Sequence, residues 1–197
     1  SYKNRRYGWF GDYGDWAEAK AVSSGYDSKV IIQKVHAALL KVKNGEELFE
    51  RDSVIFDEIH YSWPLLAGLM FAASQSNGEI NVLDFGGSLG SSFFQNKKFL
   101  DRMKKVSWNI VEQEHFVEIG KRDFEDGKLK FFKNVKNCIE AERPNILLLS
   151  SVLQYIENPY VLLDEVLMYK SFNFIILDRT PFVDGGRDIV KLQKVPP

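Results

Sequence analysis

A short apolar run that ends in an acid and passes at once into closely spaced glycines is the most constraining feature of this sequence. The run Ile80-Asn81-Val82-Leu83-Asp84 is followed by Phe85-Gly86-Gly87-Ser88-Leu89-Gly90. This order is typical of a strand that enters a glycine-rich turn in front of a helix. Glycine lets backbone N–H groups approach a ligand without an intervening Cβ atom, and the helix adds unpaired donors at its N-terminus. The segment therefore predicts a binding site for a nucleotide-type ligand.

Apolar runs and helical patterns alternate from this segment onward. Strands are predicted at Ile80–Asp84, Trp108–Glu112, Leu129–Phe132, Ile146–Ser150 and Phe174–Asp178, with helices starting near Leu89, Glu114, Lys136 and Asn158. Such alternation indicates βαβ units and a parallel sheet that is covered on both faces. We therefore predict an α/β, Rossmann-like fold with a mostly parallel sheet and helices on both faces.

The first 78 residues carry a different pattern, in which helical spacing dominates. We predict a loop over residues 1–14 and helices over Asp15–Val22, Asp27–Lys43 and Asp52–Ala73, with a kink at Pro64. Asn77-Gly78 is the natural boundary. The chain is thus expected to comprise an α-helical N-terminal segment or lid at 1–78 and a Rossmann-like core at 79–197.

Composition excludes several classes of function. The 26 Lys and Arg residues balance 27 Asp and Glu residues, so the charge gives no support for a general nucleic-acid partner. Cys138 is the only cysteine, which rules out an intrachain disulfide and a cysteine-based metal site and fits a reducing cytoplasm. No apolar run reaches the roughly 18 residues of a membrane span. We expect a cytoplasmic protein without a membrane span, a bound metal or a nucleic-acid partner.

Three ligand loops compete for the glycine segment. A P-loop needs a lysine directly after its last glycine, and no lysine occurs in the segment before Lys97. The dinucleotide fingerprint needs glycine at positions 88 and 91, which are both serine. The loop Asp-x-Gly-x-Gly-x-Gly of class I methyltransferases is matched by Asp84, Gly86 and Gly90, with Ser88 in place of the middle glycine and Gly87 beside it. The segment therefore favours S-adenosylmethionine as the ligand.

An acid at the end of the next predicted strand supports this interpretation. Glu112 lies 22 residues after Gly90, with Gln113 beside it. A carboxylate about 20 residues beyond such a loop can accept hydrogen bonds from both ribose hydroxyls of a bound nucleoside. A plain strand-to-helix turn followed by a solvated acid is the structural alternative.

The sequence also resembles a group of class I methyltransferases associated with bacterial surface-polysaccharide biosynthesis. The segments that carry the likeness are Gly8–Tyr13, Ser24–Asp27, Glu50–Ser53, Leu83–Gly90, Val111–Gln113, Leu153–Tyr155 and Asp178–Phe182. The resemblance implies a Rossmann-like sheet that binds S-adenosylmethionine over the ends of its first two strands. It also implies a core that continues past the end of this sequence, and it assigns no substrate. We expect a small molecule or a sugar or polysaccharide precursor as the methyl acceptor.

Candidates for acceptor chemistry come from the exits of the last two strands. Ligands of open α/β sheets bind beyond the carboxyl ends of the strands. Tyr155, Asp178 and Arg179 are therefore weak catalytic candidates, and the alternatives are a packed Tyr155 and a structural Asp178–Arg179 pair. We expect replacing Gly86 with valine or Glu112 with alanine to weaken cofactor binding more than folding.

Two other functions remain open at this point. The string Gly86-Gly87-Ser88-Leu89-Gly90 also matches the nucleophile elbow of α/β hydrolases, although no histidine follows His115 to complete the order Ser, Asp, His. The serine at position 88 and the lack of an obvious base also allow a non-catalytic binding or scaffold module with a methyltransferase fold.

Overall fold

The structure is a computed structural model that describes residues 7–23, 29–51 and 54–194. It contains two compact units: Lys29–Thr180, and the two chain ends Ser1–Ser28 and Pro181–Pro197. The larger unit thus joins two of the helices predicted before residue 78 to the sheet that follows them, while the helix predicted at Asp15–Val22 belongs to the smaller unit. The division into a segment at 1–78 and a core at 79–197 stays a prediction.

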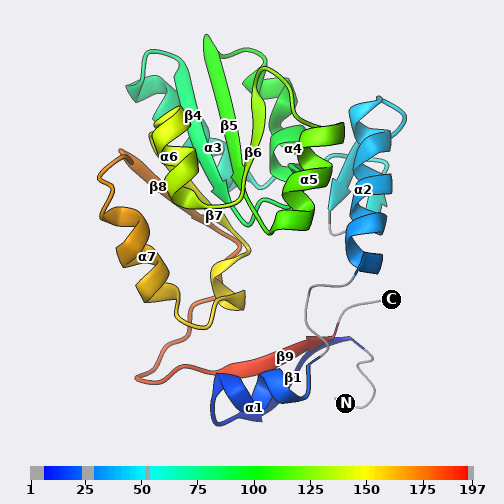
Figure 1. Ribbon diagram of the computed structural model, residues 1–197. Helices are drawn as coiled ribbons and strands as arrows, with labels where there is room; N and C mark the ends of the chain where they lie inside the picture. Colours follow the sequence, from blue (N-terminus) through cyan, green and yellow to red (C-terminus); the bar gives the residue numbers. More distant parts are fainter. Residues whose placement is uncertain (1–6, 24–28, 52–53, 195–197) are drawn as a thin grey trace. The chain divides into compact units, whose positions relative to one another are not determined.

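A parallel five-stranded sheet forms the centre of the larger unit (Figure 1). Its strands lie in the order β6-β5-β4-β7-β8, and every neighbouring pair is parallel. Their bounds are β4 Glu79–Phe85, β5 Lys105–Val111, β6 Leu129–Phe132, β7 Ile146–Ser150 and β8 Phe174–Asp178. The predicted α/β, Rossmann-like fold is confirmed, because all five predicted strands are present and strand order reverses at β4.

Helices cover both faces of this sheet (Figure 1). Alternate residues of a strand point to opposite faces, so Val82 packs with one helix layer and Leu83 with the other. The first layer contains α2 Lys29–Lys43, α3 Trp63–Gln75, α4 Ser91–Leu100 and α5 Glu114–Asp123, and the second contains α6 Val135–Glu142 and α7 Pro159–Leu167. The helix starts predicted near residues 89, 114, 136 and 158 are confirmed to within two residues.

The chain directly before β4 contains a pair of short strands and a shorter helix where the sequence predicted one long helix. A hairpin of β2 Phe49–Arg51 and β3 Val54–Phe56 occupies part of the range predicted as a helix from Asp52 to Ala73, so that prediction is wrong there. The helix starts at Trp63, and Pro64 lies in its first turn rather than at a kink. Proline suits the first turn because the N–H that it lacks would have no helical partner there. Asp27 and Asp52, the residues at which two of these helices were predicted to start, lie outside the described residues.

The smaller unit pairs the two ends of the chain. Strand β1, Gly8–Tyr13, runs antiparallel to β9, Val190–Lys194, and helix α1, Trp16–Ala21, follows β1. The predicted loop over residues 1–14 is therefore wrong where the chain is described from Tyr7 onward. Asp15, where this helix was predicted to start, caps α1, since its side chain accepts a hydrogen bond from the backbone N–H of Glu18 at 2.8 Å.

Two asparagine side chains within β4 and β5 form a hydrogen-bonded network. Asn109, which is fully buried, donates to the side-chain oxygen of Asn81 at 2.8 Å and to the carbonyl of Val82 at 2.9 Å. Asn81 in turn donates to the carbonyl oxygen of Glu142 at 2.6 Å. These bonds join the sheet to the end of α6, and the single thiol of the chain, Cys138, is fully buried within the same helix.

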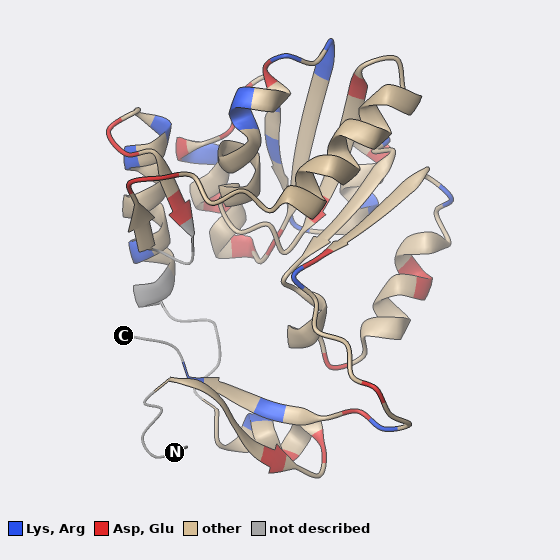
Figure 2. Cartoon of the chain, turned by 180° about the vertical axis from the view of Figure 1, so that it is seen from behind, with Lys and Arg blue, Asp and Glu red and all other residues tan. Residues whose placement is uncertain are grey.

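Charged side chains of both signs are interspersed over the helices and loops, as Figure 2 shows, while the strands of the central sheet are largely uncharged. This distribution agrees with the balanced composition. Among the described residues, no helix combines the length and the apolar character that a bilayer crossing needs.

Candidate functional site

The turn after β4 has an unusual backbone conformation. Gly86 and Gly90 have φ angles of 70° and 104°, and Ser88 between them has a φ of 53°. Only glycine adopts this left-handed region without cost, so the serine keeps the conformation of the glycine that it replaces. The turn therefore retains the backbone path expected of an Asp-x-Gly-x-Gly-x-Gly loop.

The glycines of this turn are required for packing against the protein itself. A Cβ atom on Gly86 would lie 2.6 Å from a methyl of Val152, and one on Gly87 would lie 2.6 Å from the carboxylate of Asp84. The sequence suggested instead that the missing Cβ atoms leave room for a ligand. It follows that valine at position 86 would disturb folding as well as binding, contrary to our expectation from the sequence.

Asp84 lies beneath the turn rather than on its open side. Its side chain is 1% exposed and accepts a hydrogen bond from the indole N–H of Trp108 at 3.0 Å. Burial raises the pKa of Asp84 to about 7, although the Trp108 hydrogen bond and the charge of Arg179 oppose this shift. A carboxylate this deeply buried presents almost no surface to a ligand, and the predicted cofactor contacts of Asp84, Gly86, Gly87, Ser88 and Gly90 stay predictions.

Glu112 follows β5 and directs its carboxylate to the glycine turn. It is half-buried, and it accepts a hydrogen bond from the backbone N–H of Gln113 at 2.6 Å. Burial raises its pKa, and backbone hydrogen bonds from Gln113 and Ser88 oppose this shift. The structure thus brings together the predicted residues Ser88, Glu112 and Gln113, while the predicted contact with a cofactor stays a prediction.

Two side-chain atoms at this edge of the sheet lack hydrogen-bond partners. The hydroxyl of Ser88 and the side-chain oxygen of Gln154 are buried, and neither has a partner within the described residues. Both belong to loops that follow strands, β4 and β7 respectively. Buried polar atoms are nearly always paired in native proteins, so these two call for a functional explanation.

A further carboxylate lies at the first turn of the helix that follows the glycines. Glu50, on β2, is 1% exposed and accepts a hydrogen bond from the hydroxyl of Ser91 at 2.6 Å. The sequence placed Glu50 only in a segment of resemblance. No local pattern could reveal its position, because the contact joins residues that are 41 positions apart.

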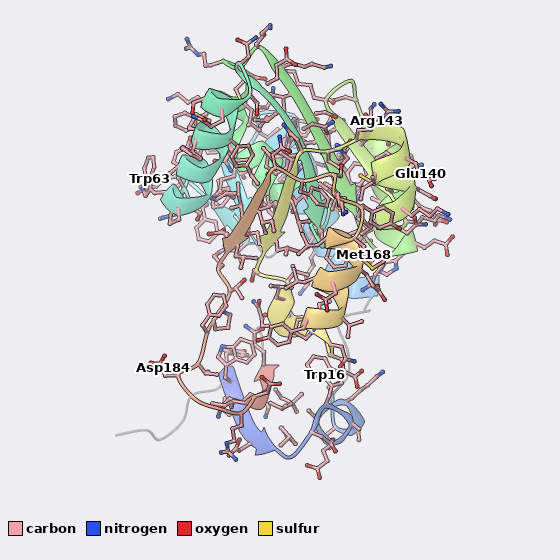
Figure 3. The ribbon with its side chains drawn as sticks, turned by 90° about the vertical axis from the view of Figure 1, so that its left-hand side faces the viewer. Trp16, Trp63, Glu140, Arg143, Met168 and Asp184 are labelled. Carbon is pink, nitrogen blue, oxygen red and sulfur yellow. The ribbon has the colours of Figure 1, made fainter. Side chains whose placement is uncertain are left out.

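A groove lies between α6 and α7, next to the ends of β4 and β5. It has a volume of about 850 Å³, and Phe85 and Val111 line it where the two strands end. These residues directly precede Gly86 and Glu112, so the groove begins beside the glycine turn. Figure 3 labels Met168, which lines the groove where α7 ends, Glu140 on α6, and Arg143 directly after α6. Pockets of this size accommodate drug-sized ligands.

The acceptor-side candidates occupy the ends of the other strands. Asp178 is 5% exposed and accepts hydrogen bonds from the hydroxyls of Ser62 at 2.7 Å and Ser150 at 2.9 Å. Arg179 pairs with Asp178 at 3.3 Å, as the structural alternative predicted. Tyr155 is 47% exposed and therefore does not pack in the core.

Comparisons with known proteins find only distant similarity. No family model matches the sequence, and no curated protein matches it significantly. Among solved structures, the N-terminal domain of EvdMO1, crystallised in the presence of S-adenosylhomocysteine and D-fucose, is similar with a TM-score of 0.43 and 16% identity. The match covers 74% of this chain and 63% of that one.

The plantazolicin methyltransferase BamL, in complex with a triazolic desmethylPZN analog and S-adenosylhomocysteine, is also similar. Its TM-score is 0.37 at 12% identity, and the match covers 71% of this chain and 54% of that one. The chain thus spans less than two thirds of either protein. Likeness at these scores carries no conclusion about the ligand of this chain, which must be inferred from its own geometry.

Proposed function

We propose that the protein is an S-adenosylmethionine-dependent methyltransferase. The observation that carries the proposal is the carboxylate of Glu112, which follows β5 and meets the backbone of the glycine turn that follows β4. Strand order reverses at β4, and ligands of open α/β sheets bind beyond the carboxyl ends of strands at such a reversal. A carboxylate in this position can accept hydrogen bonds from the hydroxyls of a ribose.

The charges around the turn favour a cationic ligand over a phosphate. A pyrophosphate placed at the glycine turn would approach the half-buried carboxylate of Glu112. Like charges in a partly desolvated site repel strongly. S-Adenosylmethionine carries a sulfonium and an ammonium group and no phosphate, so it fits this acidic corner better than a dinucleotide does.

The groove beside the turn supplies room for the nucleoside. Phe85, Val111 and Leu162 give it apolar walls, and Asn134 and Asn137 add polar groups. This combination suits an adenine, which has two apolar faces and a polar edge. We propose that Ser88, Glu112 and Gln113 hold the ribose end of the ligand and that the groove holds the base.

S-Adenosylmethionine, when bound, supplies a methyl group on a positively charged sulfur. Transfer of this group is an in-line displacement, so the protein contributes mainly by aligning the acceptor and excluding water. We propose a saccharide or another small molecule as the acceptor and the cytoplasm as the compartment. Asp178 is engaged by two hydroxyls and a guanidinium, so it serves to position its neighbours and is poorly suited to act as a free base.

The hydrolase alternative receives little support from the site. A catalytic serine needs a hydrogen bond to a base, and the hydroxyl of Ser88 has no partner within the described residues. Its left-handed backbone does resemble an elbow. Catalysis nevertheless requires the hydroxyl to be activated, and a matching backbone alone does not activate it.

Calorimetric titration with S-adenosylhomocysteine tests the proposal. Wild-type protein should bind it, and Glu112→Gln should bind it more weakly, whereas Glu114→Gln on the exposed surface should bind it like the wild type. AMP and NAD serve as control ligands and should bind at least tenfold more weakly. Absence of heat at millimolar S-adenosylhomocysteine would overturn the proposal. Binding without methyl transfer to any saccharide tried would instead favour the scaffold alternative.

A further inference from the structure

The carboxyl ends of β7 and β8 carry a connected set of hydroxyl, carboxylate and guanidinium groups. Arg179 donates through Nη2 to the hydroxyl of Ser150 at 3.0 Å, and that hydroxyl donates to Oδ2 of Asp178 at 2.9 Å. Nε of Arg179 lies 3.3 Å from the same carboxylate oxygen. The hydroxyl of Ser62, just before α3, donates to the other oxygen of Asp178 at 2.7 Å. The guanidinium is therefore held in a defined orientation.

Only part of this guanidinium is used by the protein. Arginine has five N–H donors in a fixed fork. The two N–H groups on Nη1 and the second on Nη2 have no partner among the described residues, and the side chain is 37% exposed. An arginine with a purely structural role would be expected to donate more of its N–H groups to the polar groups around it.

The backbone at both strand ends is also unusual. Arg179 and Ser151 have φ angles of 49° and 57°, in the left-handed region that non-glycine residues rarely adopt. The N–H of Ser151 donates to the carbonyl of Asp178 at 2.9 Å, which ties the two bends together. Strained residues of this kind gather at ligand sites and switch regions, where the surrounding structure maintains them.

A neutral hydrogen-bonding group lies beside the cation. The side-chain amide of Gln154 donates to the hydroxyl of Ser151 at 3.1 Å, and its oxygen is a buried acceptor without a partner within the described residues. A ligand hydroxyl could donate to this oxygen. The loops after β7 and β8 thus offer both a cation and an acceptor to a ligand.

We propose that Arg179 binds an anionic group, a carboxylate or a phosphate, on the methyl acceptor, and that Asp178 and Ser150 position its guanidinium for this task. The inference rests on the proposed function, because it assigns the charge of the acceptor. Arg179 would thus help to select the acceptor, at a site separate from the acidic corner at β4 and β5. The positive charge reaches that corner, since Arg179 lowers the pKa of the buried Asp84.

The test uses NMR on the full chain saturated with S-adenosylhomocysteine. The Nε–H resonance of Arg179 is assigned by its loss in Arg179→Lys. D-Glucuronate, D-glucose 1-phosphate and neutral D-glucose are then titrated as probes. At least one of the two anions should shift the resonance saturably, and D-glucose should not, because a guanidinium gains most from a charged acceptor. The anion that binds more tightly identifies the group as carboxylate or phosphate.

Variants separate binding from folding. Arg179→Gln should weaken binding of that anion at least tenfold, and Arg179→Lys should recover part of the loss because it keeps the charge. Arg122→Gln is the matched control: it removes an exposed guanidinium paired with Asp123 on α5, and it should bind like the wild type. Thermal melts of the variants should be cooperative.

Two results would overturn the inference: no saturable shift with either anion, or equal anion affinity in Arg179→Gln and Arg122→Gln. The proposed function fails on a different measurement, the titration with S-adenosylhomocysteine alone. If S-adenosylhomocysteine does not bind while the anion binds to the free protein through Arg179, the anion site is supported and its connection to methyl transfer is excluded.

Discussion

Strands β4 and β5 hold two groups of polar side chains, and the two groups differ in how well they are paired. Within the strands, the side chains of Asn109 and Asn81 donate and accept hydrogen bonds in a network that reaches the end of α6. At the carboxyl ends, burial raises the pKa of Asp84 and of Glu112, and the hydroxyl of Ser88 has no partner among the described residues.

This difference separates stability from function within the same pair of strands. A buried polar network whose members are paired holds the fold together at modest cost. Carboxylates that are buried without full compensation lower stability, and they persist where a ligand or a reaction needs them. The comparison can be tested by changing one of the two groups of side chains at a time.

The largest effect is expected from Asp84→Asn, which places an amide where the buried acid lies. The folded-state pKa of Asp84 is about 7, against 3.8 for a solvated aspartic acid, so the folded state holds a proton that the unfolded state has lost between these values. Stability therefore falls as pH rises from 4 to 7. Three pH units correspond to about 4 kcal/mol, and the variant should recover much of this at pH 8 and little at pH 4.

Urea denaturation of both proteins from pH 4 to pH 8 measures this effect. The raised pKa of Glu112 acts in the same direction, so Asp84→Asn should keep a small residual slope, which Glu112→Gln removes when added. An unchanged slope in Asp84→Asn would show that the carboxyl end does not carry the electrostatic cost assigned to it.

Asn109→Ala should break the asparagine network within the strands. It leaves the side-chain oxygen of Asn81 without its donor in a partly buried place, and it removes the donor to the carbonyl of Val82. We expect a loss of about 3 kcal/mol in the free energy of unfolding. Affinity for S-adenosylhomocysteine should stay within twofold of the wild type, and a large loss of affinity in the folded variant would contradict the separation.

Glu112→Gln should affect binding rather than folding. The amide keeps one acceptor oxygen but loses the charge and the second acceptor, so affinity for S-adenosylhomocysteine should fall about tenfold, or ~1.4 kcal/mol. Thermal stability at pH 7 should be unchanged or slightly higher, because burial disfavours the charged acid. Equal affinity in Glu112→Gln and the control Glu114→Gln would exclude a ribose contact.

Ser88→Gly should give the smallest effect, a gain of about 1 kcal/mol in stability, because glycine adopts the left-handed backbone without cost. Ser88→Ala is the matched control, since it removes the unpaired hydroxyl but keeps the Cβ atom. The difference in the free energy of unfolding between the two variants, measured by urea denaturation, gives the cost of the left-handed backbone conformation at position 88. A less stable Ser88→Gly would mean that the serine makes a compensating contact.

Local patterns in the sequence predicted the sheet well. Each strand of the central sheet is a compact apolar run, such as Ile146–Ser150, and the helices between the strands start near their predicted residues. The glycine turn and Glu112 were found because their spacing along the chain is itself the signal. The meeting of Glu112 with the turn then follows from parallel strands that end at the same edge.

The parts that sequence did not predict depend on contacts between distant residues. Strands β1 and β9 pair residues 8 and 194, and β2 and β3 have only three residues each, so no periodicity could reveal them. Glu50 is a charged residue whose burial depends on packing against α4. The packing role of Gly86 likewise depends on Val152, which lies far along the chain on another loop.

The buried position of Cys138 has a practical consequence. It is the only thiol of the chain, and burial raises its pKa to about 12, so it is almost entirely unionised and out of reach of alkylating reagents in the native state. Iodoacetamide can modify it only when α6 separates from the sheet. The rate of modification therefore measures how often the core opens, and no engineered probe is needed. The same measurement allows the stability of every variant to be followed under native conditions.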